Sequence, residues 1–138
     1  SGIGTITLLA AKQAKHAIGV EIVKEAVLDA NVNRDINNIK NATFHVDDAG
    51  EFLVDYQELN KIDVVFVDPP RKGLSEVFIN KILEARPPKM VYVSCDPATL
   101  ARDLKMLNEC YKIEEIECLD MFPRTAHVET IGILKLKE

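Results

Sequence analysis

One cysteine of the chain occupies a position where its thiol could act as a nucleophile. Residues 90–93 are apolar and partly β-branched, which predicts a short buried strand. Asp96 is a favoured helix N-cap and Pro97 fits the first helical position, with apolar residues following at helical spacing. Cys95 therefore falls in a strand-to-helix turn, where backbone N–H groups and the positive end of the helix stabilise a thiolate. The adjacent carboxylate of Asp96 opposes this effect, because it disfavours a second anion.

Glu129 supplies a carboxylate that could work with this thiol. It lies next to apolar Val128 in the last predicted strand. Together, the two groups suit covalent activation of a pyrimidine, in which a thiolate adds to carbon 6 and carbon 5 becomes able to accept a methyl group. A base must then remove the proton of carbon 5, and such help is typically worth about 10² to 10⁴ in rate. The alternatives are a solvated strand carboxylate and, for Cys95, a small buried hydrophobe.

A second carboxylate ends another predicted strand. Residues 63–68 have the pattern of a buried strand, and Pro69 and Pro70 end it. Such a strand delivers Asp68 to the carboxyl edge of a sheet, where ligands bind in open α/β folds. The two prolines stiffen the loop that carries Arg71. A simple strand-ending turn is the alternative, although Asp-Pro-Pro-Arg is more specific than a turn requires.

Two glycines open the chain in a pattern that many nucleotide-binding loops share. Gly2 and Gly4 form a G-x-G without a third glycine, which on its own is equally well explained by the start of a helix. Glu21 follows about 20 residues later at the end of the next predicted strand, where an acid can bind a ribose hydroxyl. Asp48, at the end of the third predicted strand, could meet the adenine end of the same nucleoside or cap the next helix.

The remaining cysteines and the histidines give no such pattern. Cys110 and Cys118 lie outside strand-to-helix turns, and the three cysteines form no C-x-x-C pair. An odd number without that pair argues against a disulfide framework. His16, His45 and His127 lack metal-ligand spacing with one another or with the cysteines, so no metal site is predicted.

Strands that alternate with helices position these residues. This order predicts an α/β fold with a largely parallel, doubly wound sheet. Residues 111–119 alternate partly in polarity and residues 128–136 more clearly, which predicts a closing antiparallel pair. No strand precedes the glycine turn, so the first strand of such a fold is missing from the sequence. The other strands are expected at residues 16–22 and 42–46, and the helices at 6–14, 25–37, 51–59, after Ser75 and after Asp96.

Composition narrows the class of protein further. The 138 residues, 47% of them hydrophobic and 28% charged, are expected to form a single soluble domain, 1–138. No apolar run is long enough to span a bilayer, and no leader opens the chain, which makes the cytoplasm the expected compartment. The net charge of −5 is not that of a self-sufficient nucleic-acid binder.

Four motifs occur in an order that resembles one family over nearly all of the chain. In all four motifs the chain resembles the catalytic domain of the RNA uracil-5-methyltransferases. These enzymes form 5-methyluridine in ribosomal or transfer RNA. The cysteine and glutamate motifs are specific to that family, whereas most methyltransferases share the glycine turn. The motifs are Gly2-Ile-Gly-Thr, Asp68-Pro-Pro-Arg-Lys-Gly, Val93-Ser-Cys-Asp-Pro-Ala-Thr-Leu-Ala-Arg-Asp and Phe122-Pro-Arg-Thr-Ala-His-Val-Glu-Thr.

The resemblance implies a Rossmann-like S-adenosylmethionine-dependent methyltransferase fold and a role for each site residue. Cys95 would be the nucleophile and Glu129 the base, acting on a uracil flipped out of its RNA stack. Asp68 would serve both the target uracil and the cofactor, while Arg71 and Arg124 would contact the substrate. The S-adenosylmethionine pocket would be lined by Gly2, Gly4, Glu21, Asp48 and Asp68.

The sequence departs from the family pattern in several places. Asp96 stands where Asn is usual, and Ser1 stands where the family has a Cys in the lead-in to the glycine turn. The first strand and the N-terminal RNA-binding domain are absent, which fits the acidic balance because that domain would hold most of the RNA. The chain is therefore expected to be a fragment of a longer enzyme, weakly active or inactive alone. Its incomplete sheet could also pair with a second chain.

Two other functions remain open at this point. An amino-methyltransferase acting on adenine or glutamine also carries an Asp-Pro-Pro motif, but typically with an aromatic residue where this chain has Arg71. Such an enzyme needs neither Cys95 nor Glu129. The other alternative is a non-catalytic module that binds a nucleoside or a protein partner.

Overall fold

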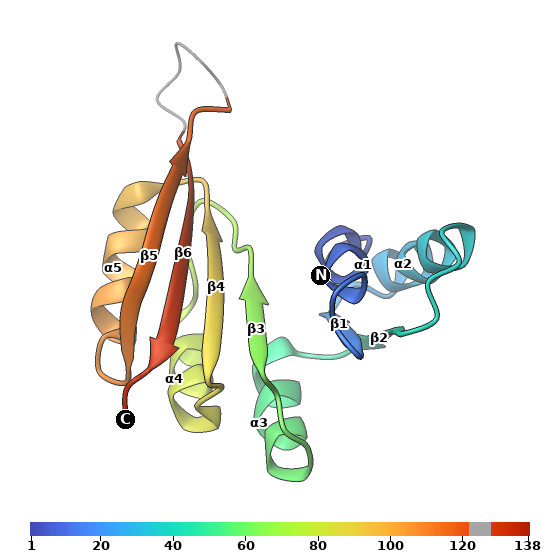
Figure 1. Cartoon of the computed structure of the whole chain (residues 1–138), viewed down its shortest axis with the longest axis horizontal. Coiled ribbons are helices and arrows are strands. Elements are labelled where there is room, and N and C mark those ends of the chain that lie inside the picture. Colours follow the sequence, from blue (N-terminus) through green and yellow to red (C-terminus); the bar gives the residue numbers. More distant parts are fainter. Residues whose placement is uncertain (122–127) are drawn as a thin grey trace. The chain divides into compact units, whose positions relative to one another are not determined.

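A computed structural model of the chain describes residues 1–121 and 128–138. The chain divides into two compact units, residues 1–52 and 53–138, each with its own packed elements. We refer to them as unit 1 and unit 2 (Figure 1). The prediction that residues 1–138 form a single domain stays a prediction.

Unit 1 contains a parallel strand pair with helices before and after each strand. Its elements are α1 (Thr5–Ala11), β1 (Ala17–Glu21), α2 (Lys24–Ile36), β2 (Ala42–Val46) and the start of α3 (Ala49–Leu59). In the β1–β2 pairing Gly19 lies opposite Phe44. The small core is formed by Leu8, Ala11, Ala17 and Ala42.

All five predicted segments of this half are confirmed. The spacing of Val27, Ala30 and Ile36 predicts that these residues share one face of α2, and this is wrong for Ile36. Val27 and Ala30 of α2 are buried, but Ile36 is 71% exposed. Nine residues separate Val27 from Ile36, and nine residues of α-helix amount to about two and a half turns. Ile36 therefore lies on the face opposite Val27.

Unit 2 contains a four-stranded sheet of order β3-β4-β6-β5 (Figure 1). β3 and β4 are parallel, while β4–β6 and β6–β5 are antiparallel, so the predicted closing antiparallel pair is confirmed. The elements after α3 are β3 (Val64–Val67), α4 (Glu76–Ala85), β4 (Lys89–Ser94), α5 (Pro97–Leu107), β5 (Tyr111–Leu119) and β6 (Glu129–Leu136).

The core of unit 2 is built by one face of the sheet and the two helices α4 and α5. β4 alternates strictly between half-buried and buried residues, and β6 does so over its first six residues. This period of two is the pattern of strands with one face in a core. The residues of this core that have no exposed surface include Ile79, Ile82, Met90, Tyr92, Leu107 and Tyr111.

The strand predicted at residues 63–68 is present, but its predicted burial is wrong. β3 covers only Val64–Val67, and within it Val64 is 38% and Phe66 47% exposed. A continuous apolar run is typical of a central strand, which has strands beside it and helices over both of its faces. β3 pairs only with β4 in the part of the chain that the structure describes.

The helices are short. The longest of those described, α2, has 13 residues. A helix needs about 20 apolar residues to cross a bilayer. No helix within residues 1–121 or 128–138 has the length and apolar character needed to span a membrane.

Candidate active site

Cys95 lies in a tight, hydrogen-bonded turn between β4 and α5. Ser94 Oγ donates to the carbonyl of Asp96 at 2.9 Å and accepts its backbone N–H at 3.1 Å. Asp96 Oδ1 in turn accepts the backbone N–H groups of Ala98 and Thr99 at 2.9 and 3.1 Å, with Pro97 at the first helical position. The predicted N-cap is confirmed, and it places the half-buried Cys95 directly before the start of α5.

Glu129 is at the same end of the sheet as Cys95. In the β4–β6 ladder Ser94 lies opposite Thr130, and this is the last pair at that end of the ladder. Cys95 follows Ser94, and Glu129 precedes Thr130, so both are one residue from the same pair. Both side chains are half-buried. The structure therefore brings the two predicted reacting residues to one end of the β4–β6 pair.

Asp68 is also at this end. β3 and β4 are parallel, and Val67 lies opposite Tyr92 in their pairing. Asp68 comes directly after β3, where it is exposed, at the carboxyl edge shared with Cys95. Three of the predicted residues thus meet at the edge where ligands bind in α/β sheets. Arg124, one of the two predicted substrate residues, lies outside the described residues.

The loop after Asp68 lies against the start of α5. Thr99 Oγ1 donates to the backbone carbonyl of Arg71 at 3.0 Å, and Gly73 N–H closes a turn on the carbonyl of Pro70 at 2.8 Å. The N–H of Thr99, with help from the Arg71 guanidinium, lowers the pKa of the Asp96 carboxyl below its usual value. Arg71 therefore lies near the residue that follows Cys95.

A buried carboxylate that sequence reasoning missed lies behind this loop. Asp103 of α5 is 0% exposed, and its Oδ2 accepts the Tyr92 hydroxyl at 2.6 Å and the Leu74 N–H at 2.7 Å. Its Oδ1 accepts Nε and Nη2 of Arg102 at 2.9 and 2.6 Å. Burial first, and then the Asp103 carboxylate, raises the pKa of Tyr92 well above its usual value. The pattern that could have indicated this group is an acid three residues after Leu100, on the apolar face of a helix.

In unit 1 the glycine turn and Glu21 are joined directly. Gly2 N–H donates to Glu21 Oε2 at 2.9 Å, and Val23 N–H donates to Oε1 at 3.1 Å. These bonds, that of Gly2 most of all, lower the pKa of Glu21 from 4.5 to about 2. The carboxylate is thus held ionised at the end of β1, while its contact with a ribose stays a prediction.

Gly4 and Asp48 have clear structural roles in unit 1. Gly4 caps α1 with φ at 91°, and a Cβ there would come within 2.8 Å of the Phe44 ring. Asp48 Oδ1 accepts the N–H groups of Gly50 and Glu51 at 2.9 and 3.0 Å, which is the geometry of an N-cap for α3. The capping alternative for Asp48 is therefore present in the structure, while its contact with a nucleoside stays a prediction.

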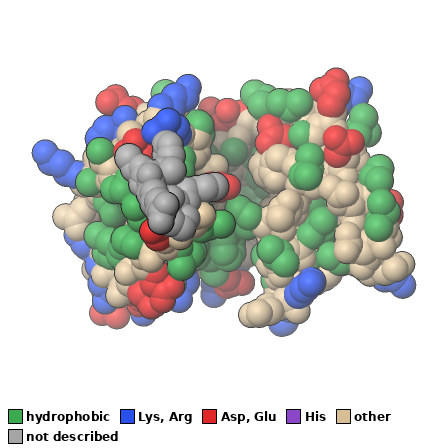
Figure 2. All heavy atoms as spheres, turned by 90° about the horizontal axis from the view of Figure 1, so that it is seen from above, with side chains coloured by type: hydrophobic (Ala, Val, Ile, Leu, Met, Phe, Trp, Pro, Cys, Tyr) green, Lys and Arg blue, Asp and Glu red, His purple; other side chains and the backbone are tan. Residues whose placement is uncertain are grey.

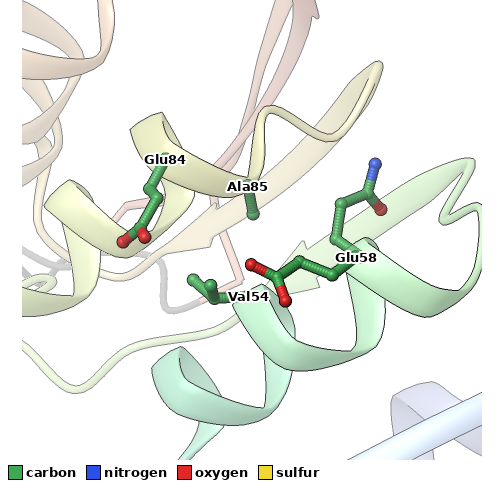
Figure 3. A pocket seen from close by; sticks show the side chains of 5 residues that line it. Val54, Glu58, Glu84 and Ala85 are labelled. Atoms are coloured by element: carbon green, nitrogen blue, oxygen red, sulfur yellow. The ribbon is translucent and has the colours of Figure 1, made fainter.

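The pocket drawn in Figure 3 lies away from these residues. It has a volume of about 160 Å³ and is lined by Val54, Gln57 and Glu58 of α3 and by Glu84 and Ala85 of α4. These residues come from the last turns of the two helices, at the end where β3 and β4 begin. Ligands of parallel sheets bind at the opposite edge, so this pocket is not the candidate site. In the described part of the chain, no three His, Cys, Asp or Glu side chains form a group that could hold a metal ion.

The fold and the site define the class of protein. The structure of a putative tRNA (m1A22) methyltransferase from Streptococcus pneumoniae superposes with a TM-score of 0.73 at 14% identity, over 100% of this chain and 61% of that one. An rRNA methylase from Streptococcus thermophilus superposes with a TM-score of 0.69 at 13% identity, over 99% of this chain and 82% of that one. The predicted fold is confirmed: it is the Rossmann-like α/β fold of S-adenosylmethionine-dependent methyltransferases.

A family model and two more similar relatives identify the family of the chain within this fold class. The chain belongs to the tRNA (uracil-5-)-methyltransferase family, whose model matches residues 1–138. The tRNA (uracil-54, C5)-methyltransferase of Pyrococcus abyssi, solved in complex with S-adenosyl-L-homocysteine, is 41% identical with a TM-score of 0.84, covering 97% of this chain and 32% of that one. An uncharacterized RNA methyltransferase of Bacillus cereus is 51% identical over 98% of this chain. The chain spans about 30% of the length of that relative.

Proposed function

We propose that this chain is the catalytic domain of a longer enzyme that uses S-adenosylmethionine to methylate carbon 5 of a uridine in ribosomal or transfer RNA. The observation that carries the proposal is the β4–β6 register, which sets Cys95 and Glu129 one residue beyond the same Ser94–Thr130 pair. Family membership supports the substrate class. An amino-methyltransferase, the rival enzyme, has no need for these two residues together.

The two residues divide the reaction between them. The thiolate of Cys95 adds to carbon 6 of the flipped uracil and leaves carbon 5 electron-rich. Bound S-adenosylmethionine supplies the methyl group. Glu129 then takes the proton from carbon 5, the electrons of that C–H bond restore the double bond between carbons 5 and 6, and the bond from carbon 6 to sulfur breaks. The thiolate is regenerated, and the proton leaves through Glu129.

The residues of unit 1 fit a methyl donor of this kind. A Cβ at Gly2 would meet no atom within 4 Å, so a ligand can approach the backbone there. Glu21 is ionised. Its Oε2 accepts the Gly2 N–H and the Ser1 amino group, whereas Oε1 accepts the Val23 N–H and keeps a second lone pair for a hydroxyl donor. We assign the ribose to Glu21 and the amino-acid end to the turn at Gly2 and Gly4, with Asp48 near the adenine and Asp68 toward the target base.

The RNA must be held largely by surface outside this chain. Figure 2 views unit 2 from the end at which β3 and β4 finish, and charged side chains of both signs alternate there with hydrophobic ones. A surface that holds RNA phosphates is rich in Lys and Arg, whereas the chain carries a net charge of −5. We therefore infer that another part of the longer enzyme supplies most contacts with the RNA backbone. Arg71 and Arg124 are left to contact the target nucleotide.

The covalent step is tested with RNA that contains 5-fluorouridine. Fluorine replaces the proton that Glu129 removes, so the methylated adduct cannot break down and the enzyme stays attached to the RNA. The full-length enzyme is incubated with this RNA and S-adenosylmethionine, and the complex is detected by denaturing electrophoresis and mass spectrometry. We expect an adduct with wild type and with the control Cys118→Ala, and none with Cys95→Ala. An adduct that survives Cys95→Ala, or its absence from wild type, would overturn the proposal.

A further inference from the structure

We propose that Thr99 and Arg102 of α5 are positioning residues, which hold the loop carrying Arg71 beside Cys95 during the attack on uracil. This inference rests on the proposed function, because it concerns the same reaction. It adds two residues that contact backbone groups of the loop and have no part in the chemistry itself. The loop is defined here as residues 69–75, between β3 and α4.

Thr99 connects the cysteine turn to the loop. Its N–H donates to Asp96 Oδ1 at 3.1 Å, and its hydroxyl reaches the carbonyl of Arg71 at 3.0 Å. The same hydroxyl lies 3.1 Å from the carbonyl of Asp96. One side chain therefore ties the residue after Cys95 to the backbone of Arg71, and the distance between the thiol and the guanidinium depends on it.

Arg102, one turn further along α5, holds the next part of the loop. Its Nη2 donates to the carbonyls of Lys72 and Leu74 at 2.9 and 3.2 Å. The guanidinium is itself fixed by Oδ1 of Asp103, which is buried and bonded to Tyr92 of β4. The carboxylate holds the planar guanidinium through Nε and Nη2, and the same Nη2 faces the two loop carbonyls in a fixed direction. The loop is thus attached to the strand that ends at the cysteine turn.

Gly73 shows how closely the loop approaches the helix. Its φ is 76°, and a Cβ at this position would come within 2.5 Å of Asp103 Oδ2 and 2.7 Å of Arg102 Nη2. A side chain there would push the loop away from α5. Glycine is therefore required both by the left-handed backbone and by the contact with the two charged groups.

These contacts make a specific prediction about catalysis. A misplacement of about 1 Å in a site can lower a rate by about a hundredfold. If Thr99 acts by placing Arg71, its removal will slow formation of the carbon 6 adduct, and the effect will vanish once the Arg71 side chain has been removed. If Thr99 only stabilises the fold, the effects of the two substitutions will multiply.

The experiment measures the single-turnover rate of adduct formation between the full-length enzyme and 5-fluorouridine RNA. Thr99→Val keeps the shape of the side chain and removes the hydroxyl, and Arg102→Gln removes the guanidinium. We expect both to slow the adduct by about ten- to a hundredfold. The melting temperature should stay nearly unchanged in Thr99→Val, whereas Arg102→Gln should lower it, because the buried Asp103 carboxylate loses its partner. Thr99→Ser restores the hydroxyl and the rate. Lys105→Gln, the same change of charge on the same helix, leaves the rate at the wild-type value.

A cycle with Arg71→Ala completes the test. We expect Arg71→Ala and the double variant Arg71→Ala/Thr99→Val to be equally slow. Two results would overturn the inference and leave the proposed function intact. One is a double variant that is slower than Arg71→Ala by the full factor seen in Thr99→Val alone, and the other is a wild-type rate in Thr99→Val or in Arg71→Ala. A wild-type enzyme that forms no adduct at all overturns the proposed function, and the inference with it.

Discussion

Ser94 and Thr130 lie directly opposite each other in the antiparallel ladder of β4 and β6, and each is only 3% exposed. Cys95 and Glu129 are their immediate neighbours on the outer side of this pair. The register of two regular strands, and not the path of a long loop, thus fixes where the nucleophile and the base emerge. Glu129 is the first residue of β6, and Cys95 lies in the hydrogen-bonded turn directly after β4, so regular elements hold both groups accurately, which suits a thiol and a carboxylate that must act on one ring.

The first prediction concerns Glu129→Gln. An amide cannot accept the proton of carbon 5, so the methylated adduct should form on ordinary uridine RNA and fail to break down. We expect turnover to fall by about 10² to 10⁴, with an accumulation of enzyme covalently attached to RNA. Denaturing electrophoresis of the enzyme with unmodified substrate RNA and S-adenosylmethionine measures both the adduct and the product.

Glu117→Gln is the matched control for this substitution. Glu117 is an exposed carboxylate of β5 that lies opposite Ile131 of β6, so it tests the loss of one negative charge on the same antiparallel pair. Normal turnover is expected. Normal turnover in Glu129→Gln as well would show that another group collects the proton.

The second prediction separates two effects of Asp96. Asparagine keeps an oxygen that can accept the N–H groups of Ala98 and Thr99, whereas alanine does not. Asp96→Asn should therefore retain the melting temperature, while Asp96→Ala should lower it by roughly 4 °C. Asparagine also removes a negative charge beside Cys95, so alkylation of Cys95 by iodoacetamide at neutral pH should become about threefold faster. Equal alkylation rates in wild type and Asp96→Asn would show that this charge has no influence on the thiol.

Local rules were sufficient to predict the parts of the site that depend on neighbouring residues. The N-cap at Asp96, the cap at Ser75 and the antiparallel closing pair all follow from patterns within about ten residues, and all are confirmed. Capping is local because a short side chain can reach only the first N–H groups of its own helix. The turn that contains Cys95 could therefore be predicted from the sequence.

The contacts around the loop could not be predicted in this way. Leu74 and Asp103 are 29 residues apart, and their hydrogen bond exists only because α5 lies against the loop that follows β3. The burial of β3 was predicted wrongly for a related reason. Apolar character alone does not say whether a strand has strands beside it and helices over both of its faces. Arg71 could be singled out as a substrate residue from its motif, but the helix residues that hold it could not.

The third prediction concerns pH and Glu21. The pKa of this carboxyl is lowered from 4.5 to about 2 in the folded chain, chiefly by the Gly2 N–H. Because the folded pKa lies below the unfolded one, the stabilisation is complete above about pH 4.5 and is lost as the pH falls through about 2. We expect Glu21→Gln to lower the free energy of unfolding at pH 7 by about 1–3 kcal/mol, with a smaller difference from wild type at pH 3.

Urea unfolding of wild type and Glu21→Gln at several pH values measures this difference. Glu25→Gln, in the exposed first turn of α2, serves as the control and should show little change at any pH. A Glu21→Gln variant that differs from wild type equally at pH 7 and pH 2 would mean that the charge of Glu21 is not what binds the glycine turn.

The fourth prediction compares the two ends of the buried hydrogen bond between Tyr92 and Asp103. Tyr92→Phe removes one donor and leaves Asp103 bonded to Leu74 and Arg102, so the free energy of unfolding should fall by only about 1–2 kcal/mol. Asp103→Asn takes the charge away from the guanidinium and turns an N–H₂ group toward donors, which should cost about 3 kcal/mol or more. Urea unfolding measures both. The carboxylate should matter more, because it also accepts from the loop and from the arginine. A larger loss in Tyr92→Phe than in Asp103→Asn would contradict this and place most of the stabilisation in the Tyr92 hydroxyl.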